Sequence, residues 1–325
     1  MSSKVLVTGA AGGAQGATGN RLTRLLREMG VPVRAFVHKV DQRSDVLREM
    51  GAEIFAGDLV DLQSVRQALK GIESIYFCYP VQADLLEATA VLAQAAREED
   101  VKFIFQLSSG SSSDQSSSPW GRKAWLSEQI LEWSGIPSFH LRPALFLESL
   151  LRQFAKGIRQ DSEIRAPFGS GDGKVPSIAA EDVARLALKV LLDPEPFIGK
   201  AYQLFTSNLS LNELAQEIAK LLGRPILYHE ITPDQFLKES IDREGSANQE
   251  GKDHLISLWE NFLTLNQDQE FMARMVKGHD AFKRMTGESP TSLIEWLKLN
   301  QAAIEGDGAF PSNLKPVNKG LAEEL

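Results

Sequence analysis

Five glycines lie within eleven positions of the stretch VTGAAGGAQGATGNRL, residues 7–22. Glycine adopts positive φ freely, and a turn without side chains lets backbone N–H groups reach phosphate oxygens at the start of a helix. Such a stretch is typical of a loop that binds the pyrophosphate of a dinucleotide. Glycines also mark ordinary turns, so the flanking elements must decide the interpretation.

Two frames for this loop compete. One frame starts at the end of the preceding strand and uses Gly9, Gly12 and Gly16. The other has an even spacing of three residues and ends at Gly19. The apolar face of the following helix begins at Leu22, so a helix that starts directly after Gly16 would carry Gly19 in its first turn. Gly19 is better placed where helix and strand pack together.

The second frame is therefore favoured. It assigns Gly9 to the strand exit and Gly16 and Gly19 to the turn at the phosphates, with residues 12–14 in an enlarged loop. A Cβ atom in that turn would keep the backbone away from the pyrophosphate. The residues expected to contact the cofactor here are Gly9, Gly13, Gly16, Ala17, Thr18 and Gly19.

The elements that must position this loop alternate between short apolar strands and helical patterns, the rhythm of βαβ units. Crossovers of this kind make neighbouring strands parallel and put helices on both faces. The expected strands are 4–9, 31–37, 52–58, 74–80, 102–109 and 137–143. The expected helices are 20–30, 45–51, 62–71, 85–100 and 121–135. The pattern predicts an α/β protein with a Rossmann-type doubly wound parallel sheet.

The regular alternation ends after residue 143. A Gly-rich turn follows at 167–176, then a strand near 200–206 that is expected to return to the sheet, and residues 240–300 look largely helical. The serine-rich run 108–119 is expected to be mostly a solvated loop. The expected divisions are an NAD(P)-binding domain at 1–150, a smaller and mostly helical substrate lobe at 151–310, and a flexible tail at 311–325.

Composition excludes several function classes. The chain has 325 residues, 43% of them hydrophobic, and no apolar run long enough to cross a bilayer. Cys78 is its only cysteine, and no Cys/His cluster has zinc-site spacing, so a metal site is not expected. A formal net charge of −8 argues against nucleic acid as a partner. The start MSSKVLVTG has no targeting signal, which favours a cytoplasmic protein with a small-molecule partner.

The end of the second strand bears on the type of nicotinamide cofactor. A carboxylate there selects NAD through the ribose 2′-hydroxyl, whereas a cation selects the 2′-phosphate of NADP. His38 and Lys39 stand at this position, and the nearest acid, Asp41, lies past the turn. The two residues are also compatible with ordinary exposed positions. The missing acid nevertheless favours NADP(H).

Other strand ends supply further candidates, because ligands of open α/β sheets collect at the carboxyl edge. Tyr79, Pro80 and Gln82 follow the fourth strand and are expected to flank the middle of the cofactor. Ser108 and Ser109 end the fifth strand.

Seven segments together resemble the NmrA-like branch of the atypical short-chain dehydrogenases, over about residues 4–298. Counted back from Gly30, Gly19 falls on the third glycine of that family's loop, which leaves about four extra loop residues here. The segments are VTGAAGGAQGATGNRL, VRAFVHK, GAEIFAGDL, ALKGIESIYFCYP, SGIPSFHLRPALFLESLL, DGKVPSIAAEDVARLA and MTGESPTSLIEW.

The resemblance implies site residues beyond the glycine loop. Asp58 and Leu59 match the adenine contacts of the family. The segment after the sixth strand lies where relatives pass beneath the nicotinamide and begin the substrate wall, and its apolar side chains suit a planar, hydrophobic substrate. The substrate residues implied in this way are Pro143, Ala144, Leu145 and Phe146.

The match is weakest at the catalytic residues. Short-chain dehydrogenases use a Tyr-x-x-x-Lys pair, in which the phenol exchanges a proton, and no tyrosine here has a lysine four positions later. Members that retain the lysine carry it eleven residues before a glycine matching Gly135, where this chain has Ala124. Either Lys123 takes the role through a slip of one position, or the lysine is absent. Glu128 matches a family glutamate but is equally compatible with a surface charge.

Two function classes follow from the resemblance. One is an NADPH-dependent reductase of a quinone, azo compound, dye or enone, in which the acceptor is positioned against the cofactor and takes its proton from water. The other is a sensor that binds NADP(H) and acts through a protein partner without turnover. The reductase is favoured, because the sequence shows no obvious surface for a partner. His140, inside an apolar strand, is expected to be a core residue.

Overall fold

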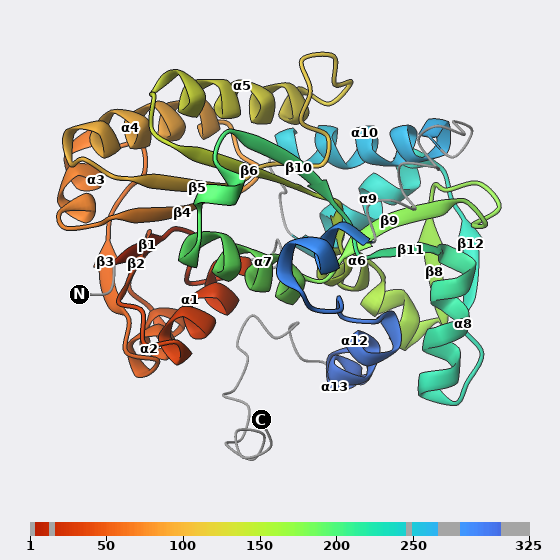
Figure 1. Cartoon of the computed structure of the whole chain (residues 1–325). Coiled ribbons are helices and arrows are strands. Elements are labelled where there is room, and N and C mark those ends of the chain that lie inside the picture. The colour runs from red at the N-terminus through yellow and green to blue at the C-terminus, as the bar shows by residue number, and fades with distance from the viewer. Residues whose placement is uncertain (1–3, 13–16, 245–248, 266–279, 307–325) are drawn as a thin grey trace.

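The computed structural model describes residues 4–12, 17–244, 249–265 and 280–306 (Figure 1). The sheet and its flanking helices lie on the left of this view, and a smaller lobe lies on the right. In that part of the chain, no helix is long and apolar enough to span a membrane.

Seven parallel strands form the main sheet, in the order β10-β6-β5-β4-β1-β2-β3. The chain starts in the middle, moves to one edge and then returns to build the other, which is the doubly wound order. The predicted fold class is thus confirmed. The strands are β1 (Val5–Val7), β2 (Val33–Val37), β3 (Glu53–Ala56), β4 (Ser74–Cys78), β5 (Phe103–Leu107), β6 (Ser138–Pro143) and β10 (Lys200–Leu204).

Helices cover both faces of this sheet (Figure 1). Leu22 and Leu26 pack with Val183 and Val190 in the core on one face, whereas the core on the other face contains residues such as Leu92. The first face carries α1 (Thr18–Glu28), α2 (Gln42–Glu49) and α7 (Ala180–Leu192). The second carries α3 (Leu62–Leu69), α4 (Leu85–Glu98) and α5 (Pro119–Trp133).

Three of these helices begin two or three residues before their predicted starts. Asp41 and Ser44 form a capping box at α2, and the Ser118 hydroxyl caps α5. These short polar side chains satisfy free N–H groups, so the helices extend back to them. The third case, α1, begins at Thr18, so the expectation that the helix starts after Gly19 is wrong, and that glycine lies in its first turn.

The smaller lobe has its own core around Phe154, Ile164, Phe168 and Trp296. It holds a three-stranded sheet, β11-β9-β7, and a two-stranded sheet, β12-β8. Its strands are β7 (Leu145–Phe146), β8 (Glu163–Ala166), β9 (Lys174–Ile178), β11 (Ser207–Ser210) and β12 (Leu227–Glu230). Its helices are α6 (Leu147–Gln160), α8 (Leu211–Leu222), α9 (Pro233–Glu244), α10 (Gln249–Leu265), α12 (Leu293–Leu299) and α13 (Gln301–Glu305).

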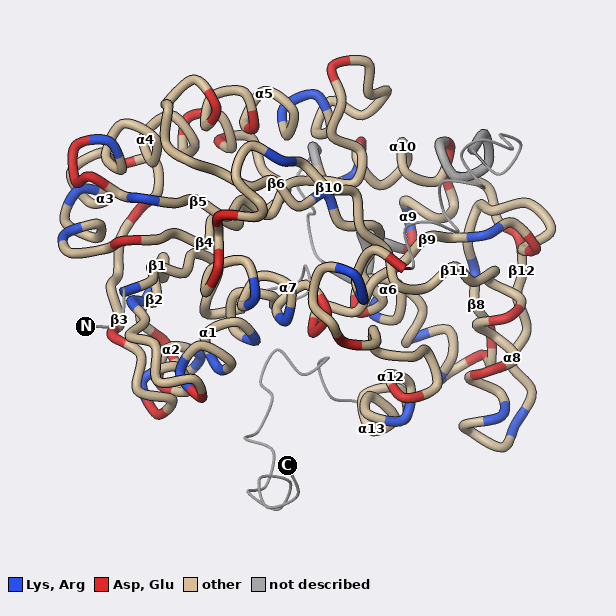
Figure 2. Tube along the Cα trace, in the orientation of Figure 1, with Lys and Arg blue, Asp and Glu red and all other residues tan. Residues whose placement is uncertain are grey.

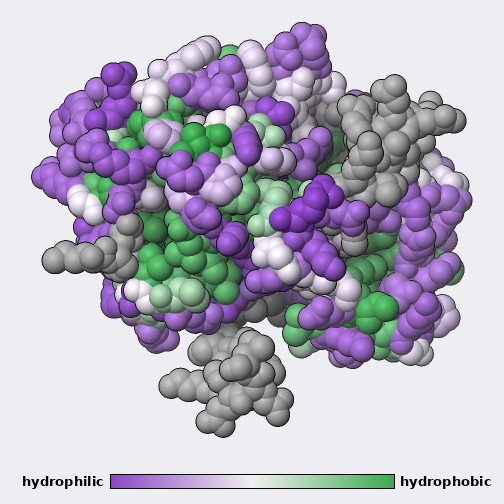
Figure 3. Space-filling view, viewed as in Figure 1, coloured by the Kyte–Doolittle hydropathy of each residue, from purple (hydrophilic) through white to green (hydrophobic). Residues whose placement is uncertain are grey.

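The chain crosses more than once between the main sheet and the smaller lobe. The strand expected near 200–206 is β10, which pairs with β6. Helix α7 packs on α1, and its residues belong to the core of the main sheet. Residues 180–204 therefore pack with the main sheet, although they follow the expected domain boundary near residue 150. The face seen in Figure 3 is mostly hydrophilic, with an apolar area over α1 and α7.

Candidate functional site

The glycine-rich loop runs from β1 to α1. Gly9 has a φ of +64°, and a Cβ atom on Gly19 would lie 2.7 Å from the carbonyl oxygen of Thr8. Residue 19 must therefore be glycine for α1 to pack this closely on the end of β1, although it lies in the first turn of the helix and not before it. Gly13 and Gly16 lie outside the described residues.

The start of α1 is suited to an anion. Its N-cap residue, Ala17, is in the left-handed region with a φ of 54° and offers no side-chain cap, and the first turn has no acidic residue. The first N–H groups of a helix have no partner within it and form a positive end. This end of α1 fits the pyrophosphate of a dinucleotide.

The ends of β2 and β3 lie next to this loop in the sheet order. His38 and Lys39 are exposed directly after β2. Asp58, after β3, is also exposed, and its carboxylate accepts a hydrogen bond of 3.1 Å from the backbone of Val60. Leu59 beside it is half-buried. The parallel strands bring these residues to the carboxyl edge that also carries the glycine loop.

The ends of β4 and β5 continue the same edge. Tyr79 is half-buried, and burial together with nearby carboxylates raises its pKa to about 12, so its phenol stays protonated at neutral pH. Pro80 and Gln82 are exposed beyond it. Ser109 is nearly buried, and its hydroxyl lies 2.9 Å from that of Ser111.

Glu128 on α5 is the residue whose environment the sequence described least well. Only 1% of it is exposed. Arg142 donates to it from Nε at 3.0 Å and from Nη2 at 2.5 Å, Ser112 donates at 2.7 Å, and Ser108 also donates. It is thus no surface charge, and Ser112 is no solvated loop residue. The i, i+4 spacing of Ala124 and Glu128 was a usable signal for one shared helix face.

Two opposing effects set the pKa of Glu128. Burial raises it, but the hydrogen bonds from Arg142, Ser108 and Ser112 outweigh burial and leave the pKa below its ordinary value. The carboxylate is therefore ionised at neutral pH, and it fixes the ends of β5 and β6 relative to α5.

Lys123 and Ala124 show which residues of α5 face inward. Ala124 is 2% exposed, in the row that also contains Glu128. Lys123 is half-buried, and its ammonium group donates to the carbonyl oxygen of Ala83, in the loop after β4, at 3.4 Å. Lys123 thus borders the carboxyl edge from the side of β4, and its catalytic role stays a prediction.

His140 is a hydrogen-bonded core residue, as expected. It is 1% exposed, and its Nδ1 lies 2.7 Å from the amide oxygen of Gln106. Burial lowers its pKa to about 4, so the ring is neutral at pH 7. In the described part of the chain, no group of three or more His, Cys, Asp and Glu side chains could hold a metal ion.

The expected substrate wall follows β6. A Cβ atom on Gly110, after β5, would lie 2.5 Å from the carbonyl oxygen of Pro143, so the two strand ends are in close contact. Ala144 donates to Leu204 at 2.9 Å, and Leu145 pairs with Ser177 of β9. Phe146, the next residue, is half-buried. The segment therefore joins the carboxyl edge to β9, which begins at Lys174, inside the range 167–176 predicted as a Gly-rich turn.

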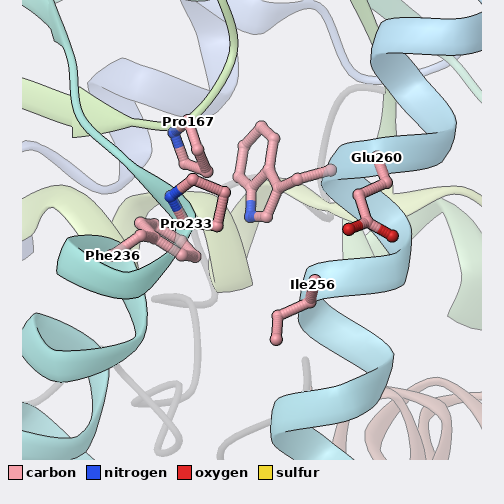
Figure 4. Close-up of a pocket in the computed structure, with 6 residues that line it drawn as sticks. Pro167, Pro233, Phe236, Ile256 and Glu260 are labelled. Atoms are coloured by element: carbon pink, nitrogen blue, oxygen red, sulfur yellow. The ribbon is translucent and has the colours of Figure 1, made fainter.

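A cavity lies in the smaller lobe, between residues of α9 and α10 and Pro167 (Figure 4). The ring of Trp259 on α10 packs edge-on against Phe168 and Phe236. The lining is almost entirely apolar. It consists of Pro167, Pro233, Phe236, Ile256, Trp259 and Glu260.

A buried ion pair connects α1 to the smaller lobe. Arg21, in the first turns of α1, lies 3.3 Å from Glu148 of α6, and their side chains are 8% and 5% exposed. Glu148 also accepts from the indole of Trp296 at 3.2 Å and from the backbone of Ala180, at the start of α7. This carboxylate thus links α1, α6, α7 and α12.

Comparisons with known proteins agree with this architecture. The NAD(P)H azoreductase of Xenophilus azovorans is 31% identical over 227 residues, which cover 69% of this chain and 77% of the relative. Two solved structures share the fold. Triphenylmethane reductase of Citrobacter sp., complexed with NADP(H), has a TM-score of 0.74 and 21% identity and covers 91% of this chain and 99% of its own. The NADPH-dependent quinone oxidoreductase QOR2 of Escherichia coli, complexed with NADPH, has a TM-score of 0.73, 21% identity and the same coverage.

The match to the family pattern is longer than the sequence match to the azoreductase. The pattern that defines the NmrA-like family matches residues 1–297, which include the glycine loop, every strand of the main sheet and most of the smaller lobe. This protein therefore belongs to the NmrA-like family.

Proposed function

We propose that this protein is an NADPH-dependent reductase that transfers a hydride to a small planar acceptor such as a quinone, an azo compound, a dye or an enone. The observation that carries the proposal is the start of α1, where Gly19 allows close packing on β1 and the helix end has neither a side-chain cap nor an acid. The similarity to an NAD(P)H azoreductase supports the reaction class.

The adenosine half of the cofactor is assigned to the ends of β2 and β3. His38 and Lys39 would contact the 2′-phosphate, while Asp58 and Leu59 would lie along the adenine. A cation at the end of β2 stabilises NADPH relative to NADH by charge pairing. We expect NADPH to bind at least about ten-fold more tightly, a difference of about 1.4 kcal/mol.

The nicotinamide half is assigned to the ends of β4 and β5. Tyr79, Pro80 and Gln82 would flank the middle of the cofactor, and Ser108 and Ser109 would lie near the nicotinamide. Bound NADPH supplies the hydride. The hydrogen bond from Ser108 to Glu128 holds the end of β5 in place for this contact.

The acceptor is assigned to the carboxyl edge of the main sheet beside Pro143–Phe146, the segment that leads from β6 into the smaller lobe. The mostly apolar side chains of this segment suit a flat, hydrophobic molecule. The chain has no Tyr-x-x-x-Lys pair, and the acceptors proposed here need none, because water can supply the proton once the hydride is delivered.

Lys123 remains the one proposed catalytic side chain. Its position beside the loop after β4 would let the ammonium group hold the nicotinamide ribose. Lys123→Met is expected to lower kcat/KM for the acceptor about ten-fold. An unchanged kcat/KM would remove Lys123 from the proposal.

Cofactor oxidation tests the function directly. Wild-type protein is mixed with NADPH or NADH and a panel of quinones, azo compounds, triphenylmethane dyes and enones, and loss of reduced cofactor is compared with product formed. Stoichiometric turnover with NADPH supports the reductase. Binding of NADPH with no turnover across the panel would instead support the second candidate, a sensor that acts through a protein partner, which the missing Tyr-x-x-x-Lys pair favours.

A further inference from the structure

An ion pair stands at the start of α2, immediately beyond the proposed 2′-phosphate site. The guanidinium of Arg43 donates to the carboxylate of Asp41 from Nε at 3.0 and 3.2 Å and from Nη2 at 2.6 Å. The side chains are 46% and 39% exposed, so solvent and ligands reach both. Figure 2 shows basic and acidic residues interspersed along α2.

The geometry of α2 directs Arg43 toward the cofactor edge. Side chains in a helix point back toward its N-terminus, and Arg43 lies in the first turn. Its contact with the N-cap residue Asp41 places the guanidinium beside the loop that leaves β2. That loop carries Lys39 and begins at the carboxyl end of β2, where the ribose 2′ group lies in this fold.

Asp41 is the first acid after β2, but its carboxylate already has partners. It caps α2 by accepting from the backbone N–H of Arg43 at 2.9 Å, and it accepts from the guanidinium as well. The bond from Arg43 is the main cause that lowers the pKa of Asp41, so the acid stays ionised. An acid engaged in this way is poorly placed to accept both hydroxyls of an NADH ribose.

We propose that Arg43 determines cofactor specificity by exchanging the carboxylate of Asp41 for the 2′-phosphate of NADPH. A guanidinium binds carboxylate and phosphate with the same two-pronged geometry, and phosphate carries the larger negative charge. Asp41 therefore competes with NADPH for Arg43, while NADH offers Arg43 nothing to bind. The inference rests on the proposed NADPH-binding function.

The competition predicts opposite effects for the two partners. Arg43→Gln should weaken NADPH binding about 5- to 10-fold, because one charged contact to the phosphate is lost. Asp41→Asn should strengthen NADPH binding about 2- to 5-fold, since asparagine caps a helix as well as aspartate does but releases Arg43. Neither substitution should change NADH affinity by as much as NADPH affinity.

The same helix offers a matched control. Arg48 pairs with Asp45 three residues earlier, with side chains 54% and 57% exposed, and both residues lie farther along the chain from the carboxyl end of β2 than Arg43. Arg48→Gln removes a similarly exposed cation from α2. It should leave the affinities for both cofactors unchanged.

Calorimetric titration of the full chain with NADPH and with NADH measures all four proteins, and thermal unfolding checks that each is folded. The expected order of NADPH affinity is Asp41→Asn above wild type, wild type equal to Arg48→Gln, and Arg43→Gln lowest. If Arg43→Gln matches Arg48→Gln, or if Asp41→Asn weakens NADPH binding, the inference is wrong while the proposed function stands. A wild type that binds no NADPH, or prefers NADH, refutes the proposed function itself.

Discussion

Glu128 on α5 and Arg142 at the end of β6 form an ion pair in which one partner is buried and the other reaches the surface. Nη2 of Arg142 lies 2.5 Å from Oε2 of Glu128, and the side chains are 28% and 1% exposed. The same carboxylate accepts hydrogen bonds from Ser108 and Ser112, which follow β5. One buried charge thus holds together three segments at the carboxyl edge of the sheet.

Removing this charge is expected to destabilise the protein and to disturb the site. Glu128→Ala leaves Arg142 without its partner and two serine hydroxyls without their acceptor, at a cost of about 3 kcal/mol in the free energy of unfolding. Urea denaturation at pH 7 measures this. Glu132→Gln, on the exposed side of the same helix, should cost less than about 0.5 kcal/mol. Similar losses for both variants would contradict the role given to Glu128.

Gly19 is expected to tolerate no side chain. An added Cβ would lie 2.7 Å from Thr8 and 2.8 Å from Gly9, both backbone contacts, so Gly19→Ala forces α1 away from β1. We expect a stability loss of about 1 to 3 kcal/mol and loss of NADPH binding in calorimetry. Gly30→Ala serves as the control, because Gly30 has positive φ but open space around its Cβ position.

Gly30→Ala should therefore lower stability by about 1 kcal/mol through backbone strain and leave NADPH affinity intact. If Gly19→Ala binds NADPH as the wild type does, α1 is not the phosphate helix. Gly12 also has positive φ, at +74°, so Gly12→Ala is expected to carry the same strain in the loop. Its effect on NADPH affinity should be smaller than that of Gly19→Ala.

His140 predicts how stability depends on pH. Its pKa falls from 6.5 to about 4 on folding, mainly because of burial, so the unfolded chain binds a proton that the folded protein does not. The contribution of His140 to the free energy of unfolding is fully present above pH 6.5. It is lost as the pH falls from 6.5 toward 4, which lowers the free energy of unfolding by up to about 3 kcal/mol. Denaturation curves at pH 7, 6 and 5 for wild type and His140→Gln test this. The variant should lose less stability over that range, and parallel losses would contradict the assignment.

We expect Glu148 to stabilise the fold more through the hydrogen bonds that it accepts than through its charge. Burial raises its pKa, although Arg21 opposes this shift, and the carboxylate also accepts from Trp296 and Ala180. Glu148→Gln keeps one acceptor oxygen, whereas Glu148→Ala keeps none. We expect the alanine variant to lose about 3 kcal/mol of stability and the glutamine variant less, measured by urea denaturation. Equal losses in the two variants, both of which lack the charge, would show that the charge dominates.

The sequence by itself determined the class of fold and the place proposed for the nucleotide site. Alternating strand and helix patterns are local properties, since each depends on residues a few positions apart, and they predict the parallel sheet. The need for glycine at position 19 is also local, because an added Cβ atom would bring the start of α1 into a clash with the end of β1, the strand directly before it. The strand at 200–206 could also be predicted, because its apolar pattern is local.

Tertiary structure alone decided what the polar side chains of the site touch. Whether Glu128 is a surface charge or a buried acceptor depends on Arg142, which approaches from strand β6, and no local pattern contains that contact. In the same way, burial of Ala124 distinguishes it from Lys123, one position earlier on the helix, because one residue corresponds to a rotation of about 100°. Long-range contacts set these roles, since burial and charge pairing come from the packing of segments far apart in the sequence.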